Sequence, residues 1–525
     1  MREPIINIEK FNKKNRNFVF KDGKKQILLI GVEEKIFAID NRCPHEGYPL
    51  SEGTTTKNCV LTCNWHNWKF DLKTGLCILG GDHVRTYPVE IKNGDIYVDT
   101  KGPSKEETKK FILDGLKIAF SKRQYGRLAR EITRLEFNGI DPLEAVKQSI
   151  LWSFDKFEYG MTHAYAACSD WLSLYKTLDP SRKEEKIVCL TETIDHIAYD
   201  SLRQPEYPFT EEVLPFNEGQ YLNAIEKEDE NTAIALINGP GITFKQLEKT
   251  LAEAALAHYN DFGHSLIYVY KAKTLSDHFQ DPKVDACLLK TLTRSLVNTT
   301  REDLIPEFKD YQDSLSQLKK FGDKKESPSF EELTNKRVKA CLDWVNQKAQ
   351  DHNPESLYKS LLLANADNMT HYNLDFQEAF NNPVTQNVGW LDFTHALTFS
   401  NAVRAFCSKY PDLWPKGLLQ MACFYGRNSF FTDRTLNVDA FKIKNTKDFE
   451  KQVIEKILDH GMPLPIYSAH VLKTAFALFE EGEGLNALEK EIIYRPLNRF
   501  LNSPLKAKHI RRLVKQAFNL VSKDF

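Results

Sequence analysis

Two short cysteine–histidine motifs near the start of the chain limit what this region can fold into. The first reads CPH and contains Cys43 and His45, and the second reads CNWH and contains Cys63 and His66. Two thiolates and two imidazoles on paired loops can hold a [2Fe–2S] cluster, with both cysteines on one iron and both histidines on the other. The same four side chains could instead bind one tetrahedral zinc ion. Either metal requires that the two loops lie side by side.

The sequence around the two motifs is typical of short β-strands. Apolar runs at 26–32, 35–39 and 59–62 are separated by turn residues, and IKNGDIYV places Asn93-Gly94 between two apolar stretches. Asn-Gly supplies both positive-φ positions of a type I′ turn, so this segment predicts a hairpin. We expect 1–100 to form a small all-β sandwich or barrel. This β setting, the ligand spacing and the WKFDLKTG tail favour the iron–sulfur cluster over zinc.

These motifs resemble the Rieske [2Fe–2S] domains of bacterial ferredoxins and ring-hydroxylating oxygenases. That family also has a C-x-H motif followed, after a similar stretch, by C-x-x-H and an F-D-x-x-T-G turn. The resemblance implies that Cys43 and Cys63 bind one iron of the cluster and that His45 and His66 bind the other. It covers about the first hundred residues of the chain.

Several positions depart from patterns within this family. Asn64 stands where proline is usual, and Asn67 where glycine is usual. Respiratory members carry a disulfide whose positions here are Tyr48 and Trp65, so the resemblance points to the ferredoxin and oxygenase branch. High-potential members also place a Ser and a Tyr hydroxyl where this chain has a Trp and a Phe, at 68 and 70. We therefore expect a cluster of low potential.

The rest of the chain, 105–525, reads as almost wholly helical. Ser104 and Glu107 form a capping-box pattern ahead of the first helix. The predicted fold class is thus α+β in separate domains, a small all-β domain at 1–100 followed by a large all-α domain at 105–525. A polar stretch near 322–328 predicts a division of the helical domain into two lobes.

A repeated Asp-Phe-x-His pattern marks a second candidate metal site. Residues three apart on a helix are neighbours on its surface, so each pair can direct a carboxylate and an imidazole at one place. Di-iron proteins of the helical-bundle type use Glu-x-x-His in this way. Gly263 is expected in mid-helix, where it would allow close packing or leave space for a ligand. We expect a mononuclear or dinuclear non-haem iron site formed by Asp261, His264, Asp392 and His395, joined by His163 and His258. The alternative is two local Asp–His hydrogen bonds at helix contacts.

The helical region resembles questin oxidase-like proteins in MTHAYAACSDWLSLY, ALAHYNDFGHSLIYVYKAKTL and LDFTHALTFSNAV. Those proteins are α-helical oxidases associated with ring opening of polyketides, and the resemblance points to His163, His264 and His395. A standard Rieske oxygenase does not fit, because its iron-binding D-x-x-H is followed closely by another histidine. Here Ser265-Leu-Ile-Tyr-Val follows instead.

Composition restricts the partners of the chain. Lys and Arg number 71 against 72 Asp and Glu, a formal net charge of −1, which removes the electrostatic case for nucleic acid. No apolar run is long enough to span a bilayer, and the first residues lack the apolar core of a secretory signal, so no membrane partner is expected. The 10 cysteines then fit free thiols or metal ligands in the cytoplasm.

The sequence therefore predicts an oxidoreductase with its own electron-transfer domain. A separate reductase would supply electrons to the cluster, and iron in the helical domain would use O₂ to oxidise a small organic substrate. One alternative is a Rieske redox carrier or sensor fused to a helical protein-interaction scaffold. Another places a non-covalent flavin or haem among the helices.

Overall fold

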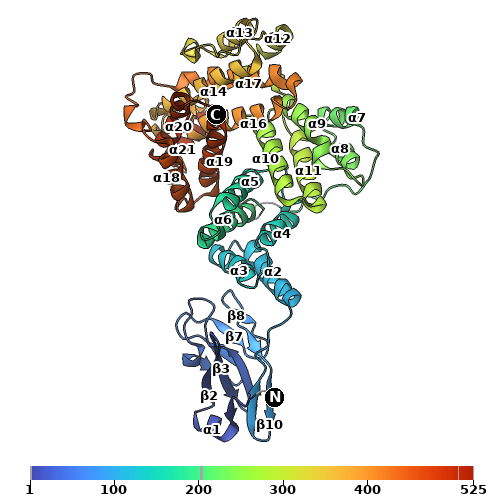
Figure 1. Cartoon of the computed structure of the whole chain (residues 1–525), viewed down its shortest axis with the longest axis vertical. Helices are drawn as coiled ribbons and strands as arrows, with labels where there is room; N and C mark the ends of the chain where they lie inside the picture. The colour runs from blue at the N-terminus through green and yellow to red at the C-terminus, as the bar shows by residue number, and fades with distance from the viewer. Residues whose placement is uncertain (1–2, 202–204, 507, 524–525) are drawn as a thin grey trace. The chain divides into compact units, whose positions relative to one another are not determined.

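The computed structural model describes residues 3–201, 205–506 and 508–523. The chain divides into two compact units, Met1–Pro142 and Leu143–Phe525 (Figure 1). The first begins with a small all-β region and the second is helical, which confirms the predicted fold class. In the described ranges, no helix is both long and apolar enough to cross a membrane.

Short antiparallel sheets form the β region of the first unit. One sheet contains β1 (Ile6–Asn7), β11 (Asp95–Val98) and β10 (Val89–Lys92) in that order, and the short helix α1 (Ile8–Lys13) follows β1. A second contains β2 (Asn17–Asp22), β3 (Lys25–Val32), β4 (Lys35–Asp40) and β9 (Thr86–Tyr87). A third contains β5 (Thr54–Thr55), β6 (Val60–Thr62), β7 (Lys69–Asp71) and β8 (Cys77–Leu79).

The predicted hairpin joins β10 to β11. Asn93 and Gly94 form its two-residue turn with φ angles of +51° and +80°, as a type I′ turn requires. Strand β3 separates two small cores, because successive side chains of a strand point to opposite faces. Leu28 points into the core that contains Cys43 and Cys63, and Ile27 points into the core that contains Ile96.

Two helices continue the first unit, α2 (Lys105–Ser121) and α3 (Tyr125–Phe137). The predicted capping box begins α2: Ser104 Oγ accepts from the Glu107 N–H at 3.2 Å, and the Glu107 carboxylate accepts from the Ser104 N–H at 2.8 Å. Both bonds satisfy donors that the first turn of a helix otherwise leaves without partners.

A buried aspartate ties α3 to the β region. Asp82 is 1% exposed, and its carboxylate pairs with Arg127 at 2.8 Å, with Arg130 at 2.5 Å and with Arg134 at 3.6 Å, all on α3. A carboxylate removed from water needs such cations, so α3 completes the β unit. The first compact unit extends to Pro142. The predicted division between 1–100 and 105–525 therefore falls inside this unit.

The second unit is built from helices of varied length (Figure 1). In chain order these are α4 (Leu143–Ser153), α5 (His163–Thr177), α6 (Lys183–Ser201), α7 (Glu218–Glu226), α8 (Glu230–Ile237), α9 (Phe244–Ala257), α10 (His264–Phe279), α11 (Pro282–Val297), α12 (Tyr311–Gln317), α13 (Val338–Lys348), α14 (Pro354–Thr370), α15 (Asp375–Glu378), α16 (Trp390–Cys407), α17 (Trp414–Asn428), α18 (Thr446–Leu458), α19 (Pro465–Gly482), α20 (Ala487–Leu501) and α21 (Ile510–Val521).

Helices α5, α10, α16 and α19 pack on one another at the centre of this unit. Helix α5 contacts α10 and α19, and α16 contacts the same two helices, so the four close a ring. Most of α16 is buried around its whole circumference, as expected for a helix inside a core. The polar stretch 322–328 is irregular chain between α12 and a 3₁₀ turn at Phe330–Leu333, and both sides of it belong to this unit.

Candidate metal centres

Two loops of nearly the same backbone structure carry the cysteine–histidine motifs. In the first, between β4 and β5, the N–H of Cys43 donates to the Tyr48 carbonyl, and the Gly47 N–H donates back to the Cys43 carbonyl, both at 2.8 Å. In the second, between β6 and β7, Cys63 bonds in the same way to the residues five and four positions later. This repeat places both thiols at the same point of their loops.

Asn67 takes the place of the first loop's glycine. Its φ is +60°, and Gly47 at the equivalent position has φ +82°. Asparagine is among the few residues besides glycine that adopt this left-handed conformation readily. Asn64, the other departure from the family pattern, ties the loop to its neighbour by donating to the Glu52 carbonyl at 2.9 Å and accepting from the Thr54 hydroxyl at 3.0 Å.

The four predicted ligands lie together. Cys43 and Cys63 are buried, whereas His45 is half-buried and the His66 side chain is 41% exposed. The Nδ1 atoms of His45 and His66 are 3.2 Å apart, and their rings are perpendicular. The two thiols thus lie on the protein side of the pair of loops and the two imidazoles on the solvent side.

The chemistry of this donor set fits a [2Fe–2S] cluster. Burial raises the pKa of the Cys43 thiol to about 11; the backbone N–H of His45 opposes this shift, and the adjacent Cys63 thiol adds to it. A thiol with its pKa raised in this way stays protonated near neutral pH, and a bound metal would release the proton of Cys43. Buried thiols beside exposed imidazoles are what a cluster with Cys₂ and His₂ irons requires.

Aromatic rings surround the two loops. Trp68 stacks on His45 with ring centroids 4.7 Å apart. Tyr48 and Trp65, at the positions of the respiratory disulfide, stack on each other with centroids 4.2 Å apart. Tyr48 and Trp65 thus join the two loops by a ring contact, at the positions where respiratory members of the family have a disulfide bond.

A second group of histidines meets at the centre of the helical unit. His163 comes from α5, His264 from α10, His395 from α16 and His470 from α19. The Nε2 atoms of His163 and His264 are 3.0 Å apart, and those of His395 and His470 are 3.1 Å apart. The rings of His264 and His395 have centroids 4.4 Å apart, so the two pairs form one cluster. We call these residues the four-histidine cluster.

Hydrogen bonds fix the orientation of three of these rings. Nδ1 of His264 contacts the Asp261 carbonyl at 2.7 Å, Nδ1 of His395 the Leu391 carbonyl at 2.5 Å, and Nδ1 of His470 the Ile466 carbonyl at 2.6 Å. A carbonyl oxygen only accepts, so each Nδ1 must carry the proton. Each Nε2 then presents a lone pair, as metal-bound histidines do when their other nitrogen is held by a carbonyl.

All four histidines are neutral near pH 7. Burial lowers the pKa of His264 to about 4, and it lowers the pKa values of His163, His395 and His470 well below the usual range. His395 and His470 therefore face each other with two lone pairs and no proton between them. That arrangement is repulsive unless a cation binds both nitrogens, so the residues present fit a metal ion.

Lys473 lies one turn after His470 on α19. It is fully buried, and its Nζ has no hydrogen-bond partner among the described residues. Burial lowers its pKa to about 7, which the carboxylate of Asp170 only partly offsets. Asp170 is itself paired with Lys271 at 2.7 Å. The polar centre of this unit thus contains a buried amine, on the same helix as His470, that has no hydrogen-bond partner among the described residues.

The loop before α10 has an unusual backbone. Asn260, Asp261, Phe262 and Gly263 all have positive φ, between +36° and +74°, and α10 begins only at His264. The expectation that Gly263 lies in mid-helix is therefore wrong; it is the residue before the helix. A phenylalanine in this region of φ stores strain, which typically accumulates at functional sites. Here the loop presents His264 and stacks Phe262 on His395, with centroids 5.4 Å apart.

The other predicted members of this site have different partners. Asp392 accepts from the Gly389 N–H at 2.8 Å, at the start of its own helix, and pairs with Arg427 at 3.1 Å. Asp261 precedes α10 and is exposed, so its side chain does not share a helix face with His264. His258 contacts the Thr299 carbonyl at 3.0 Å and Glu226 at 3.3 Å. The structure thus brings together His163, His264 and His395 of the six predicted residues.

His470 and Lys473 were missed as site residues by sequence reasoning. His470 stands in IYSAHVLKTAFAL, where a histidine and a lysine interrupt an otherwise apolar helix. A helix that is apolar on all sides is buried, so polar residues within it need partners inside the protein. The sequence therefore indicated that His470 and Lys473 need partners inside the protein, but it did not indicate which residues those partners are.

Comparison with known proteins concerns the first part of the chain. The profile of the Rieske [2Fe-2S] domain matches residues 3–88. The 3-phenylpropionate/cinnamic acid dioxygenase ferredoxin subunit of Photorhabdus laumondii is 39% identical over 74 residues, which are 14% of this chain and 70% of that protein. The subunit of the same name from Escherichia coli K12 is 38% identical over 80 residues, 15% of this chain and 76% of that protein.

Solved structures match over a similar share of the chain. The ferredoxin of carbazole 1,9a-dioxygenase from Nocardioides aromaticivorans IC177 is 21% identical and covers 19% of this chain and 99% of its own, with a TM-score of 0.18. A complex of reduced oxygenase and oxidised ferredoxin in carbazole 1,9a-dioxygenase includes a chain 28% identical, covering 16% of this chain and 85% of its own, with a TM-score of 0.15. The resemblance of the helical region to questin oxidase-like proteins stays a prediction.

The paired ligand loops, the donor set and the identity with ferredoxin subunits agree on the first part of the chain. Through residues 3–88, the chain belongs to the family of Rieske [2Fe-2S] domain proteins.

Proposed function

We propose that this chain is an oxidoreductase in which the Rieske domain delivers electrons to an iron ion held by the four-histidine cluster. The first half of the proposal is supported by the relationship to dioxygenase ferredoxin subunits. Cys43, His45, Cys63 and His66 would hold the [2Fe–2S] cluster, which supplies single-electron transfer. By analogy with those relatives, a separate reductase would be the electron donor.

The second half of the proposal, iron held by the four-histidine cluster, is supported by the opposed lone pairs of His395 and His470. Two neutral imidazoles whose unprotonated Nε2 atoms are 3.1 Å apart repel each other, and a metal cation held by both rings would remove that repulsion. Neutral imidazole is a ligand for non-haem iron, which supplies the activation of O₂. The four rings come from four packed helices, so the protein fixes their positions before any metal binds.

The remaining residues of this centre prepare its surroundings. The backbone carbonyls behind His264, His395 and His470 hold the rings in one tautomer. Phe262 covers one face of His395, and Tyr268 contacts His163 Nδ1 through its hydroxyl at 3.3 Å. Lys473, with a pKa of about 7, can lose its positive charge when a cation binds close by. We place the oxidation of a small organic substrate here, in a cytoplasmic protein.

Iron analysis of the intact protein tests this proposal. The wild type should contain three iron atoms per chain, two in the cluster and one in the four-histidine cluster. His395→Ala or His470→Ala should remove the third iron, because each leaves one lone pair without its partner ligand. The rhombic EPR signal of the reduced Rieske cluster should remain in both variants.

His258→Ala and Asp392→Asn are the matched controls. Both positions were expected ligands, but their side chains bond elsewhere, so both variants should keep three iron atoms per chain. Two iron atoms in the wild type, made with ample iron, would reject the helical site and leave the carrier or sensor alternative. Zinc without iron at the first centre would reject the cluster.

A further inference from the structure

Helix α21 lies on the protein with its polar side inward. Arg512, its buried residue, donates to the backbone carbonyls of Phe376, Gln377 and Ala379 at 2.6–2.8 Å. Gln516, one turn later, donates to the Asn382 carbonyl at 2.7 Å. These bonds hold the helix flat against the surface through two polar side chains. An ordinary surface helix has the opposite orientation, with its apolar side on the core.

The apolar side of α21 therefore faces outward. At about 100° per residue, its apolar side chains occupy a continuous arc of about 160° around the helix. All of them are exposed, and Phe518 is 73% exposed. They are Ile510, Leu513, Val514, Ala517, Phe518, Leu520 and Val521. A contiguous apolar surface of this kind marks a site of interaction.

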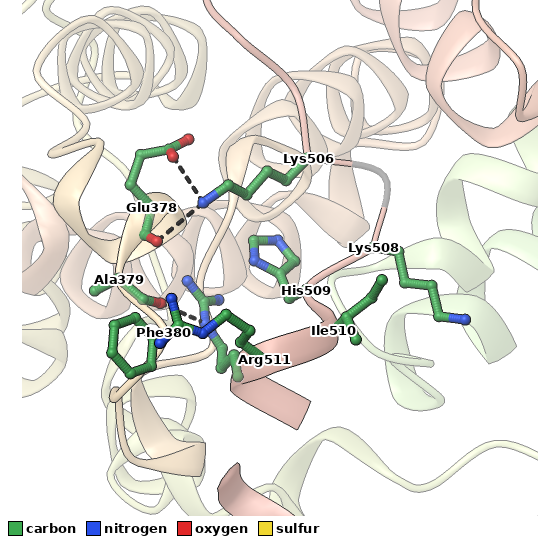
Figure 2. A pocket seen from close by; sticks show the side chains of 9 residues that line it. Glu378, Ala379, Phe380, Lys506, Lys508, His509, Ile510 and Arg511 are labelled. Atoms are coloured by element: carbon green, nitrogen blue, oxygen red, sulfur yellow. Dashed lines mark hydrogen bonds and ion pairs between the residues drawn. The ribbon is translucent and has the colours of Figure 1, made fainter. Parts of the chain in front are cut away.

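Positive charge lies along one edge of this apolar surface and at the start of the helix. Residues 506–523 contain six Lys and Arg and no Asp or Glu, in a chain whose net charge is −1. Figure 2 shows a pocket at the start of the helix that Lys506, Lys508 and Arg511 help to line; the Lys506 ammonium pairs with Glu378 at 2.7 Å, and the Lys508 side chain extends away from that pair. Arg511 and Lys515 lie over the ring of Phe380, with centroid distances of 4.0 and 5.3 Å. The cations thus border the apolar arc.

This charge decides between possible occupants of the surface. A second copy packed helix against helix would bring two strongly positive segments together. An anionic lipid surface instead offers phosphates to the lysines and arginines and acyl chains to the apolar arc. Amphipathic helices with basic residues beside Phe and Leu lie in the membrane interface in this way. Each such cation near an anionic bilayer contributes to binding.

We infer that α21 and the basic pocket at its start dock this chain on the surface of a membrane that contains anionic lipids. The apolar arc would enter the boundary between headgroups and acyl chains, and Lys508, Arg511 and Lys515 would contact lipid phosphates. The sequence predicts no membrane partner because it contains no spanning segment; a helix that lies along the surface needs none, so this inference departs from that expectation. The inference does not depend on the metal centres.

Vesicle sedimentation with the intact protein tests this inference. The protein should sediment with vesicles of phosphatidylcholine and phosphatidylglycerol, remain in solution with phosphatidylcholine alone, and be released by salt. Leu513→Ser with Phe518→Ser should abolish binding. Lys508→Glu and Lys515→Glu should each weaken it roughly fivefold or more. All four side chains are exposed, so the fold should tolerate these changes.

Phe137→Ser and Lys451→Glu are the controls, since they alter an exposed phenylalanine and an exposed lysine in other helices. Both should bind like the wild type. Equal binding to both vesicle types, no binding to either, or full binding by the Leu513/Phe518 variant would overturn the inference. A dimer in solution that dissociates in that variant, together with no vesicle binding, would assign the surface to a second copy instead.

Discussion

Phe70 is completely buried in the core that also contains Cys43 and Cys63, and it has no hydrogen-bond donor. Trp68, the other position where high-potential Rieske proteins have a hydroxyl, lays its ring against His45. Donors to the cluster sulfurs stabilise the reduced state, so the lack of hydroxyls at 68 and 70 predicts a potential near the low end of the family range, roughly −150 mV.

Phe70→Tyr should raise the potential of the cluster, because it restores one hydroxyl at this position. Protein-film voltammetry near neutral pH measures the shift. Phe20→Tyr, which alters the other small core of the β region, should leave the potential unchanged. A wild-type midpoint well above about +100 mV, in the upper part of the range, would contradict the prediction.

Lys473 predicts a pH dependence of stability. Its pKa is about 7 in the folded protein and 10.5 when unperturbed. Between these values the unfolded chain binds a proton that the folded chain does not. Stability should therefore rise with pH across this window, by up to about 1.4 kcal/mol per pH unit, and fall as pH drops toward 7.

Thermal unfolding of metal-free protein between pH 7 and pH 9 can check this dependence. Lys473→Met should remove the rise in melting temperature, and Lys451→Met, an exposed control, should preserve it. The same slope in all three proteins would show that Lys473 keeps its charge in the fold.

At the scale of an element, Asp82 allows a test of what holds helix α3 to the β region. Asp82→Asn would leave the buried Arg127 with only the more distant carboxylate of Glu131, at 3.7 Å, and breaking one partner of such a buried pair costs about 3–5 kcal/mol. Hydrogen exchange of 125–137 should become much faster, because this helix is tied to the β region through that carboxylate. Asp114→Asn on α2, which removes an exposed i,i+4 pair with Lys110, should have little effect. Unchanged exchange in Asp82→Asn would mean that apolar packing alone holds α3.

The two Asp-Phe-x-His segments show that the same short sequence motif can adopt two different backbone structures. The second begins α16, and there Asp392 bonds to the start of its own helix. The first lies across a left-handed loop, so Asp261 and His264 never share a helix face. Helical periodicity assumed for both segments predicted each carboxylate beside its histidine, and the structure places neither carboxylate there. The pattern of apolar and polar residues in the sequence does not indicate backbone strain of this kind.

Across the whole molecule, features formed by residues close together in the sequence could be predicted, and features formed by residues far apart in the sequence could not. The sequence indicated that the four predicted cluster ligands would lie together, because each pair lies within one short loop and family spacing links the loops. The hairpin at Asn93-Gly94 and the capping box at Ser104 are equally local. The four-histidine cluster depends on how four helices pack, and His395 and His470 are 75 residues apart in sequence. No single-sequence pattern specifies that pairing, nor that α3 belongs with the strands.

The spread of the four histidines along the chain has a consequence for biosynthesis. All Rieske ligands have left the ribosome early, since the last of them is His66. The helical centre is incomplete until His470, near the end of the chain, has emerged and α19 has packed beside α5, α10 and α16. On the proposed function, a nascent chain would therefore present its predicted cluster ligands before the four-histidine cluster can form. If both proposed centres bind iron, the order of translation would make the cluster site available for loading before the helical site.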